Sequence, residues 1–478
     1  MSGSQEESEK TARFGRVLSL ALVGTLWMAA GCGSGSSSST STAAASGSGS
    51  SAAGTGGPGG NTIADPAPNV AALTVNTGPN FLFTTVTVCA PGTSTCATIP
   101  NVLVDTGSYG LRILASPQGA TGTAVTSLGL TQVRAANNLP LLECVTFLDN
   151  SYVWGPVQRA DVIIAGETAG NIPIQIIGDS QFLQDVPNDC GGGIAANNEN
   201  SFDTLGANGI LGISLFIEDC GTGCAPPNPP PGSYYACSAG GAGSCEGPQN
   251  GNQNNATNVP VVNQVSNPVA FFTQDNNGTI IQLPAVPAGG AISVSGSLVF
   301  GIGTQANNGL GSATVLTAVT AEAGSNSNRA GSFTTQFNGQ TFPGSFIDSG
   351  SNGLYFVDSV TISYLQGIPV PAILLPLPTC LQSGAFSNDA SISSFYCGTL
   401  SSTATNVGTN GNSTVIHIGV ANAETQFMSN KEAFDNVAGP NSGSFDWGMP
   451  FFFGRNVYTA IEGVTPPSGV PAGPFWAY

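Results

Sequence analysis

The sequence predicts an all-β protein with two duplicated lobes. Gly, Thr, Ser, Asn and Val are abundant, whereas the helix-forming residues Lys, Glu and Arg are scarce, and this composition favours strands. From about residue 64 onward, short apolar or alternating runs are separated at close spacing by Gly, Asn and Pro, as in a many-stranded protein. One motif also occurs twice in the same setting. The 478 residues leave room for two or three domains of about 150 residues each.

Individual strands can be located from these apolar runs. Asn338-Gly339 lies between two short apolar segments and predicts a tight hairpin turn, because both residues tolerate a positive φ. The clearest predicted strands are residues 81–88, 101–104, 161–165, 172–177 and 297–300.

The repeated motif is the most informative feature of the chain. Residues 104–111 read Val-Asp-Thr-Gly-Ser-Tyr-Gly-Leu, and residues 347–354 read Ile-Asp-Ser-Gly-Ser-Asn-Gly-Leu. Each copy is followed about a hundred residues later by an apolar stretch around Gly, at 208–213 and 446–454. A single Asp-Thr-Gly-Ser is an ordinary turn sequence. Two copies with the same order of parts indicate duplicated lobes.

The repeat also suggests where the lobes begin and end. We expect residues 64–265 to form the N-terminal lobe and residues 266–478 the C-terminal lobe. Residues 217–263 are rich in Cys, Pro, Gly and Asn, so we expect a surface insertion that builds no core.

The first residues resemble a bacterial lipoprotein signal peptide, predicted over residues 1–31. A basic start precedes the apolar run 17–30, which is too short to span a bilayer. Residues 29–32, Ala-Ala-Gly-Cys, resemble a lipobox, in which the Cys is acylated and becomes the mature N-terminus. Lipoboxes usually have Leu where this one has Ala29, and the alternative is a plain signal peptide that leaves Cys32 unmodified.

Residues 32–63 contain little besides Gly, Ser, Ala and Thr, so they predict a disordered, flexible tether. Gly33 after the Cys, rather than Asp, resembles outer-membrane sorting if the organism has two membranes. The expected location is therefore the cell envelope, with the body lipid-anchored to the outer membrane and facing the periplasm or the cell surface.

The cysteines are expected to be oxidised. Removing Cys32 from the eleven leaves ten, and an even number in an exported protein indicates up to five disulfides. Short spacings favour the pairs 89–96, 237–245 and 380–397, while the connectivity stays open. No second Cys or His pair at zinc spacing follows the pair 220 and 224, so disulfides are favoured over a metal site. The candidates are Cys89, Cys96, Cys144, Cys190, Cys220, Cys224, Cys237, Cys245, Cys380 and Cys397.

Charge and composition exclude several functions. Nine Lys and Arg against 27 Asp and Glu give a net charge of −18, which argues against nucleic-acid binding. His417 is the one histidine and lies in an alternating run, so we expect an ordinary strand residue rather than a triad or metal-site member. Carboxylates remain as the candidate chemistry, with no metal and no cofactor expected.

At the two Asp motifs the sequence resembles pepsin-like aspartic peptidases, and also a family of uncharacterised bacterial lipoproteins with the same motif pair. The resemblance covers residues 70–215 and 265–460 and implies a bilobal double β-barrel. It further implies that each lobe supplies one catalytic aspartate and that apolar-Gly segments at 210–212 and 447–448 pack behind them. The implied catalytic residues are Asp105 and Asp348; the implied support residues are Thr106 and Ser349 for hydroxyl cross-links, Ser108 and Ser351 for the outer carboxylate oxygens, and Gly107 and Gly350 for tight turns.

The resemblance also implies a flap over the cleft, in a hairpin some 40 to 50 residues after the first Asp. Tyr152 is the candidate flap residue and Trp154 the second; the alternative is that both aromatics simply pack on a hairpin. A Trp expected seven residues after the first Asp is replaced by Arg112. No basic inhibitory prosegment lies between the signal and the body.

Two carboxylates at about 3 Å cannot both ionise, so the pair would share one proton and activate a water for attack on a peptide carbonyl. The predicted function is thus an exported, membrane-anchored aspartic endopeptidase, a monomer acting on a peptide or protein substrate. The alternative from another class is a non-catalytic peptide- or glycan-binding lipoprotein on the same fold. A third possibility, a purely structural surface protein, would not explain why the chain carries the paired Asp motifs.

Overall fold

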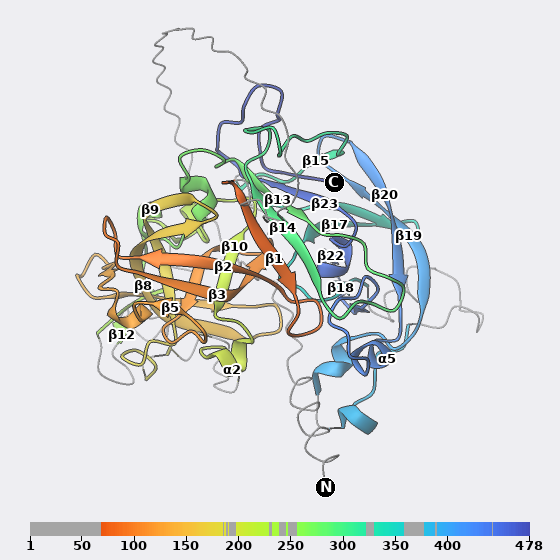
Figure 1. Ribbon diagram of the computed structural model, residues 1–478, viewed down its shortest axis with the longest axis horizontal. Helices are drawn as coiled ribbons and strands as arrows, with labels where there is room; N and C mark the ends of the chain where they lie inside the picture. The colour runs from red at the N-terminus through yellow and green to blue at the C-terminus, as the bar shows by residue number, and fades with distance from the viewer. Residues whose placement is uncertain are drawn as a thin grey trace, which may run out of the picture.

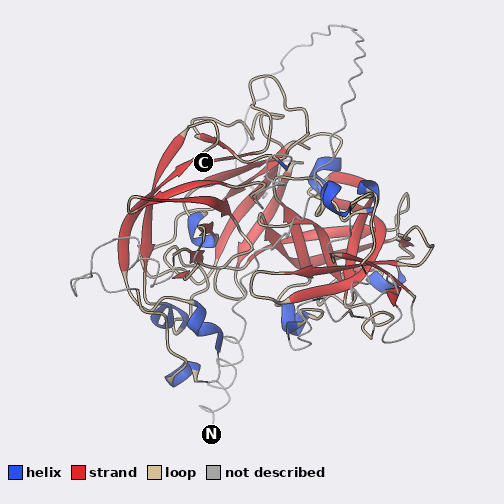
Figure 2. Ribbon diagram, turned by 180° about the vertical axis from the view of Figure 1, so that it is seen from behind, coloured by secondary structure: helices blue, strands red, loops and turns tan. Residues whose placement is uncertain are grey.

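The computed structural model describes residues 68–478, except 185, 188–189, 191–196, 229–231, 239–244, 247–255, 322–328, 358–376, 388–389 and 442. The predicted signal peptide, Cys32 and the tether lie outside the described residues. The protein is all-β with almost no helix, and it contains a closed six-stranded barrel and a nearly closed seven-stranded barrel. Figure 1 shows the two barrels beside each other, and Figure 2 shows how strongly strands dominate. The predicted fold class is confirmed.

The first barrel closes on itself through six strands. Its order around the barrel runs from β2 to β3, β10, β4, β9 and β8, and β8 pairs again with β2. Apolar side chains that alternate along β2 and β3 point into the core, because successive residues of a strand face opposite sides. The strands are β2 (Leu82–Cys89), β3 (Cys96–Asp105), β4 (Tyr109–Leu114), β8 (Tyr152–Ile164), β9 (Glu167–Ile177) and β10 (Gly209–Ile213).

The second barrel is a seven-stranded sheet in the order β20-β19-β16-β17-β22-β18-β21. The two-residue turn between β16 and β17 is the predicted Asn338-Gly339 hairpin, with φ of 48° and 76°. The strands are β16 (Phe333–Phe337), β17 (Gln340–Ile347), β18 (Leu354–Tyr355), β19 (Leu400–Val407), β20 (Ser413–Val420), β21 (Ala438–Gly439) and β22 (Asp446–Trp447). His417 lies exposed on β20, as expected.

The two barrels repeat one local topology around the Asp motifs. In the first, β10 runs parallel to β3 and antiparallel to β4, and β4 runs parallel to β9. In the second, β22 runs parallel to β17 and antiparallel to β18, and β18 runs parallel to β21. In each lobe the late apolar-Gly stretch is therefore a strand between the two strands of the Asp motif. This is the duplication that the sequence repeat predicted.

A third antiparallel sheet joins the lobes. Its pairings run β1-β14-β13-β23-β24-β15, and β1 also pairs with β2 of the first barrel. The sheet thus combines the first described strand with three strands that precede the second Asp motif and two that follow it. The strands are β1 (Val70–Val75), β13 (Gly278–Gln282), β14 (Val294–Phe300), β15 (Val315–Thr317), β23 (Asn456–Ala460) and β24 (Phe475–Ala477).

The expectation that residues 217–263 build no core is wrong. Strand β11 (Tyr234–Cys237) from this segment pairs with β7 (Leu141–Thr146), which pairs in turn with β8. Both tyrosines of β11 are fully buried. The Pro- and Gly-rich composition hid a short strand whose aromatic side chains bury enough area to hold the segment against the barrel. The remaining short elements are β5 (Thr121–Gly122), β6 (Thr131–Gln132), β12 (Cys245–Glu246), α2 (Phe202–Leu205) and α5 (Ala423–Phe427).

Disulfides hold several of these loops. The predicted bridges Cys89–Cys96 and Cys380–Cys397 are confirmed. The structure adds Cys144–Cys190 and Cys220–Cys224, whose pairing the sequence left open. Cys237 is also disulfide-bonded, but the side chain of its predicted partner, Cys245, lies outside the described part of the chain. Among the described residues, no helix is long and apolar enough to cross a membrane.

Candidate active site

The two Asp motifs meet where the lobes meet. Asp105 is the last residue of β3, and Asp348 directly follows β17, so each carboxyl stands at the end of a buried strand. The strand inserted beside each motif contributes a glycine that lets the motif pack closely. A Cβ on Gly212 would lie 2.6 Å from the backbone nitrogen of Tyr109, and one on Gly448 would lie 2.0 Å from the carbonyl oxygen of Gly353. Only glycine allows these approaches.

The two carboxyl groups have matching hydrogen bonds. The backbone N–H groups of Gly107 and Gly350 each donate to Oδ1 of the aspartate two residues earlier, both at 2.7 Å. The Ser108 hydroxyl donates to Oδ2 of Asp105. The Ser351 hydroxyl lies 2.8 Å from Oδ2 of Asp348. The outer oxygens thus have the serine contacts that the resemblance implied.

The two carboxyl groups also contact each other. A hydrogen bond links the Asp105 and Asp348 side chains. A Cβ on Gly107 would lie only 2.5 Å from Cγ of Asp348, so the second carboxyl reaches over the first Asp loop. The structure therefore brings together the two aspartates, although 243 residues separate the two motifs.

A reciprocal cross-link lies at the residues next to the aspartates. The Thr106 hydroxyl donates to the carbonyl of Ile347 at 2.9 Å and accepts from the Ser349 N–H at 3.0 Å. The Ser349 hydroxyl donates to the carbonyl of Val104 at 2.7 Å and accepts from the Thr106 N–H at 3.1 Å. Four hydrogen bonds between fully buried groups thus tie one Asp loop to the other.

Both aspartates are completely buried, with 0% of either residue exposed. Burial raises the pKa of Asp105, and hydrogen bonds from Asp348, Ser108 and Gly107, together with the Arg112 charge, partly oppose that rise. Burial also raises the pKa of Asp348 well above its ordinary value, and the charges of Asp105 and Asp446 raise it further. The environment therefore favours a negative charge on Asp105 and a proton on Asp348.

Asp446 is a buried acid at the site that sequence reasoning missed. It is 1% exposed, and its Oδ2 lies 2.7 Å from the Ser351 hydroxyl. Burial raises its pKa well above the ordinary value. A signal was present in the repeat: β22 lies beside β17 as β10 lies beside β3, and this alignment places an acid, Asp446, where the first lobe has apolar Ile210.

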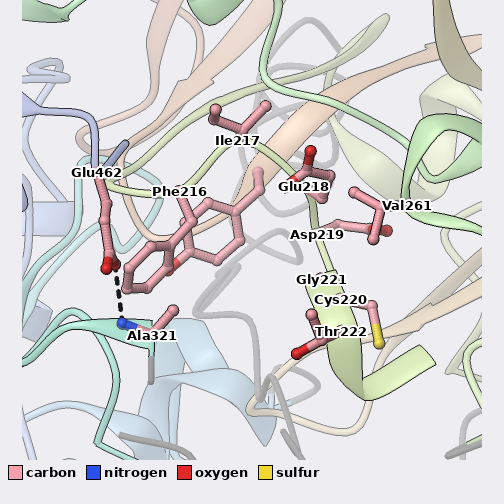
Figure 3. A pocket seen from close by; sticks show the side chains of 11 residues that line it. Phe216, Ile217, Glu218, Asp219, Cys220, Gly221, Thr222, Val261, Ala321 and Glu462 are labelled. Atoms are coloured by element: carbon pink, nitrogen blue, oxygen red, sulfur yellow. Dashed lines mark hydrogen bonds between the residues drawn. The ribbon is translucent and has the colours of Figure 1, made fainter. Parts of the chain in front are cut away.

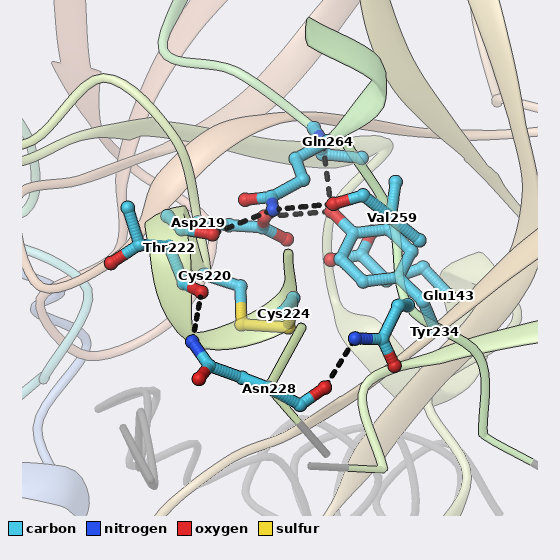
Figure 4. The surroundings of a disulfide bond; sticks show 12 residues. Glu143, Asp219, Cys220, Thr222, Cys224, Asn228, Tyr234, Val259 and Gln264 are labelled. Atoms are coloured by element: carbon cyan, nitrogen blue, oxygen red, sulfur yellow. Dashed lines mark hydrogen bonds between the residues drawn. A yellow bond between two sulfur atoms is a disulfide. The ribbon is translucent and has the colours of Figure 1, made fainter. Parts of the chain in front are cut away.

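A second buried charge cluster lies beside the first Asp motif. Arg112 on β4 bonds Glu143 of β7 at 2.7 Å and Asp219 at 3.1 Å, with all three side chains at most 5% exposed. The Tyr234 hydroxyl donates to Asp219 at 2.7 Å, and the Cys220–Cys224 bridge adjoins this group (Figure 4). Arg112, noted from the sequence only as a departure from the resembling family, is thus the cation that balances two buried acids.

Tyr152 and Trp154, the predicted flap residues, lie in a buried cluster on β8. Tyr152 is 4% exposed and Trp154 is fully buried; Phe182, Tyr235 and the Cys144–Cys190 bridge belong to the same cluster. The Trp154 indole N–H donates to the carbonyl of Phe182 at 3.0 Å. This packing favours the alternative, that both aromatics pack on a hairpin.

Replacing Trp154 with alanine is therefore expected to lower the free energy of unfolding by about 3–5 kcal/mol, the usual effect of truncating a large buried aromatic. Chemical denaturation followed by fluorescence or circular dichroism would measure the change. The matched control is Phe271→Ala, which removes a 42% exposed aromatic and should change stability far less. A Trp154→Ala variant as stable as the wild type would restore the flap interpretation.

A cavity of about 220 Å³ lies between the lobes, next to the first Asp motif (Figure 3). Tyr109 and Phe216 line one side with their rings 5.5 Å apart. Glu462 borders it from the second half of the chain and accepts the Ala321 N–H at 2.8 Å. The other lining residues are Ile217, Glu218, Asp219, Cys220, Gly221, Thr222 and Val261. Within the described ranges, no group of three His, Cys, Asp or Glu side chains is arranged to hold a metal ion.

The fold and site together define a two-barrel β-protein whose lobes each contribute one buried aspartate to a shared pair. The chain belongs to the family described as Protein of unknown function (DUF3443), whose family model matches residues 65–478. No curated protein matches the sequence.

Proposed function

We propose that this protein is an exported aspartic endopeptidase that hydrolyses peptide bonds with a water activated by Asp105 and Asp348. The observation that carries the proposal is the hydrogen-bonded carboxyl pair at the lobe junction. Two buried acids in contact destabilise a fold, so a protein with no chemistry to perform would gain from an asparagine at either position. Strongly perturbed carboxyls held in this way are typical of functional sites.

The mechanism follows from the different surroundings of the two aspartates. Asp105, nearer the Arg112 cation, carries the negative charge and draws a proton from a water molecule held between the carboxyls. The water oxygen attacks the amide carbonyl while Asp348 donates its proton to the carbonyl oxygen. Asp105 then passes the proton it received to the leaving nitrogen, one hydroxyl of the diol intermediate returns its proton to Asp348, and the C–N bond breaks to release the acid and the amine. No covalent intermediate forms between protein and substrate.

A direct test is hydrolysis of denatured proteins between about pH 3 and 7, the range in which one carboxyl of such a pair is ionised and the other protonated. Cleavage should be blocked by a transition-state-mimicking inhibitor of aspartic peptidases. Cleavage that the inhibitor leaves untouched, or that a metal chelator removes, would contradict the proposal.

The complete burial of the carboxyl pair favours a second candidate, a non-catalytic protein that binds peptides or glycans with the same fold. Hydrolysis requires the pair to meet a substrate and a water, whereas binding elsewhere on the molecule does not. Retention of peptide binding in the absence of any cleavage, and equal binding by an Asp105→Asn variant, would favour this candidate.

We also propose that Cys32 is acylated and tethers the protein to a membrane. The support is the lipobox-like segment 29–32 and the Gly- and Ser-rich stretch that follows it. The full-length protein should partition into detergent, and intact-mass measurement should find a mature chain that begins at a lipid-modified Cys32. Cys32→Ala should release the body into the aqueous phase, while Cys89→Ala, which removes a disulfide partner, should leave partitioning unchanged. An unmodified N-terminus would overturn this prediction.

A further inference from the structure

The Ser351 hydroxyl lies between two carboxyl groups. Its Oγ is 2.8 Å from Oδ2 of Asp348 and 2.7 Å from Oδ2 of Asp446. A hydroxyl has one hydrogen to donate, so it can donate to only one of these oxygens. The other contact is a hydrogen bond only if the carboxyl on that side is protonated and donates to the serine oxygen. One proton must therefore reside on Asp348 or Asp446 for both contacts to hold.

The burial of the three carboxyl groups also indicates that some of them are protonated. Asp105, Asp348 and Asp446 are each at most 1% exposed, and Oδ1 of Asp446 is buried with no hydrogen-bond partner. An ionised carboxylate in that position would lack both solvent and donors on one oxygen, which is costly. Two neighbouring carboxylates would add mutual repulsion. A single negative charge shared by the three groups avoids both penalties.

The two lobes differ in the charged residues that lie near their aspartates. The first lobe has apolar Ile210 where the second has Asp446, by the alignment of β10 with β22. Conversely, the first lobe has Arg112 one residue after the Gly-Leu of the motif, where the second has Tyr355. The first aspartate thus has a nearby cation and the second a nearby acid.

We propose that Asp446 is a positioning residue of the site, a third and protonated acid that fixes the Ser351 hydroxyl as a hydrogen-bond donor to Asp348. The proposal rests on the proposed function and extends it to a cluster of three carboxyls that holds two protons and one negative charge. The charge resides on Asp105. The two protons reside on Asp348 and Asp446, with Asp446 donating to Ser351 and Ser351 donating to Asp348.

Among the described residues, few groups face Asp446. Besides burial, Asp105 raises the pKa of Asp446, and Asp446 in turn adds to the rise that burial and Asp105 cause in the pKa of Asp348. Its strand neighbours are Phe346 on β17 and Tyr355 on β18, and the Tyr355 hydroxyl donates to Asn352. Arg112 is the cation that acts on Asp105. The proton count of the cluster is therefore set by the three carboxyls and that one cation.

The first test counts protons and needs no activity. Infrared difference spectra of the whole protein at about pH 6, above the ordinary aspartate pKa of about 3.9, should show the carbonyl band of protonated carboxyl groups. Asp446→Asn should lose one protonated carboxyl, because the amide replaces the protonated acid as a donor to Ser351. Asp275→Asn is the matched control: it replaces another buried aspartate, one bonded to Thr304 and Gln305. An unchanged band in Asp446→Asn would overturn the proposal even if the protein cleaves nothing.

The second test uses the pH dependence of hydrolysis. Asp446 fixes Ser351 as a donor to Asp348, and such a donor favours the ionised form of Asp348, so loss of Asp446 should make the Asp348 proton leave at higher pH. In Asp446→Ile, which carries the residue of the first lobe, the alkaline limb of the kcat/KM profile should move up by about one pH unit, the scale of coupling between adjacent acids, while the acid limb, set by Asp105, stays in place. Asp446→Asn keeps a donor to Ser351 and should leave the alkaline limb unchanged. A merely structural role would lower kcat/KM equally at every pH, which would refute the assignment.

If both variants and the wild type lack activity while the infrared count changes as expected, the proposed function fails and the proton count stands. If cleavage is normal and the alkaline limb of Asp446→Ile does not move, the proposed function stands and Asp446 has no part in it.

Discussion

Asp105→Asn and Asp348→Asn are each expected to abolish peptide hydrolysis, the largest effect expected from any single substitution in this protein. An amide at position 105 cannot accept a proton from water, and an amide at position 348 cannot donate an acidic proton to the carbonyl oxygen. The double variant should be no less active than either single one, because the two residues act as a unit. Initial rates on a denatured protein substrate would measure the loss.

The same variants should be at least as stable as the wild type near neutral pH. Burial places the folded-state pKa of both aspartates above the ordinary value, so their ionisation destabilises the fold increasingly as pH rises above about 4. Asparagine removes that effect, and the gain should vanish at lower pH, where both states hold the proton. Melting temperatures at about pH 3 and 7 would show whether the variants are more stable than the wild type only at the higher pH. Undiminished cleavage by Asp105→Asn would remove the pair from the mechanism.

Arg112→Met is expected to lower the free energy of unfolding by about 3–5 kcal/mol, because it leaves Glu143 and Asp219 buried without their cation. Methionine keeps most of the side-chain volume, so the loss reports charge rather than packing. Burial, and then the Glu143 charge, already raise the pKa of Asp219 well above its ordinary value, and the Arg112 charge opposes the rise. Without the arginine that pKa rises further, so the loss should be small at about pH 4 and grow toward neutral pH.

The control for this prediction neutralises the whole cluster. Arg112→Met combined with Glu143→Gln and Asp219→Asn removes all three charges and should regain most of the lost stability, as in other buried charge groups replaced together. Urea denaturation of the three proteins at two pH values would decide the matter. A single variant with wild-type stability at neutral pH would show that Arg112 does not balance the two acids.

The sequence predicted the parts of the fold that repeat. Alternating apolar residues located β2 and β9, and the paired motifs predicted both the duplication and the meeting of Asp105 with Asp348. These signals are local or repeated, so they can be read without tertiary contacts. The role of Arg112 could not be read, because its partners Glu143 and Asp219 are 31 and 107 residues away and a single charged residue in a strand carries no pattern.

The places of Asp446 and of the aromatic pair Tyr152 and Trp154 could not be predicted from the sequence, for two different reasons. Asp446 begins the apolar-Gly stretch 446–454, but its importance depends on the register between β17 and β22, which fixes its place beside Ser351. Tyr152 and Trp154 were assigned by distance along the chain from the first Asp. Whether such aromatics face a cleft or a core depends on β11, a strand from a segment whose composition indicated only a loop.

The reciprocal hydrogen bonds of Thr106 and Ser349 have a mechanical consequence. They join the two loops directly at the carboxyl pair, so they hold the spacing of the two carboxyls. Any movement of one lobe relative to the other should therefore change distances far from these four bonds more than it changes the distance between the carboxyls. Under the proposed function, the pair would keep its geometry while more distant parts of the lobes move to accept a substrate.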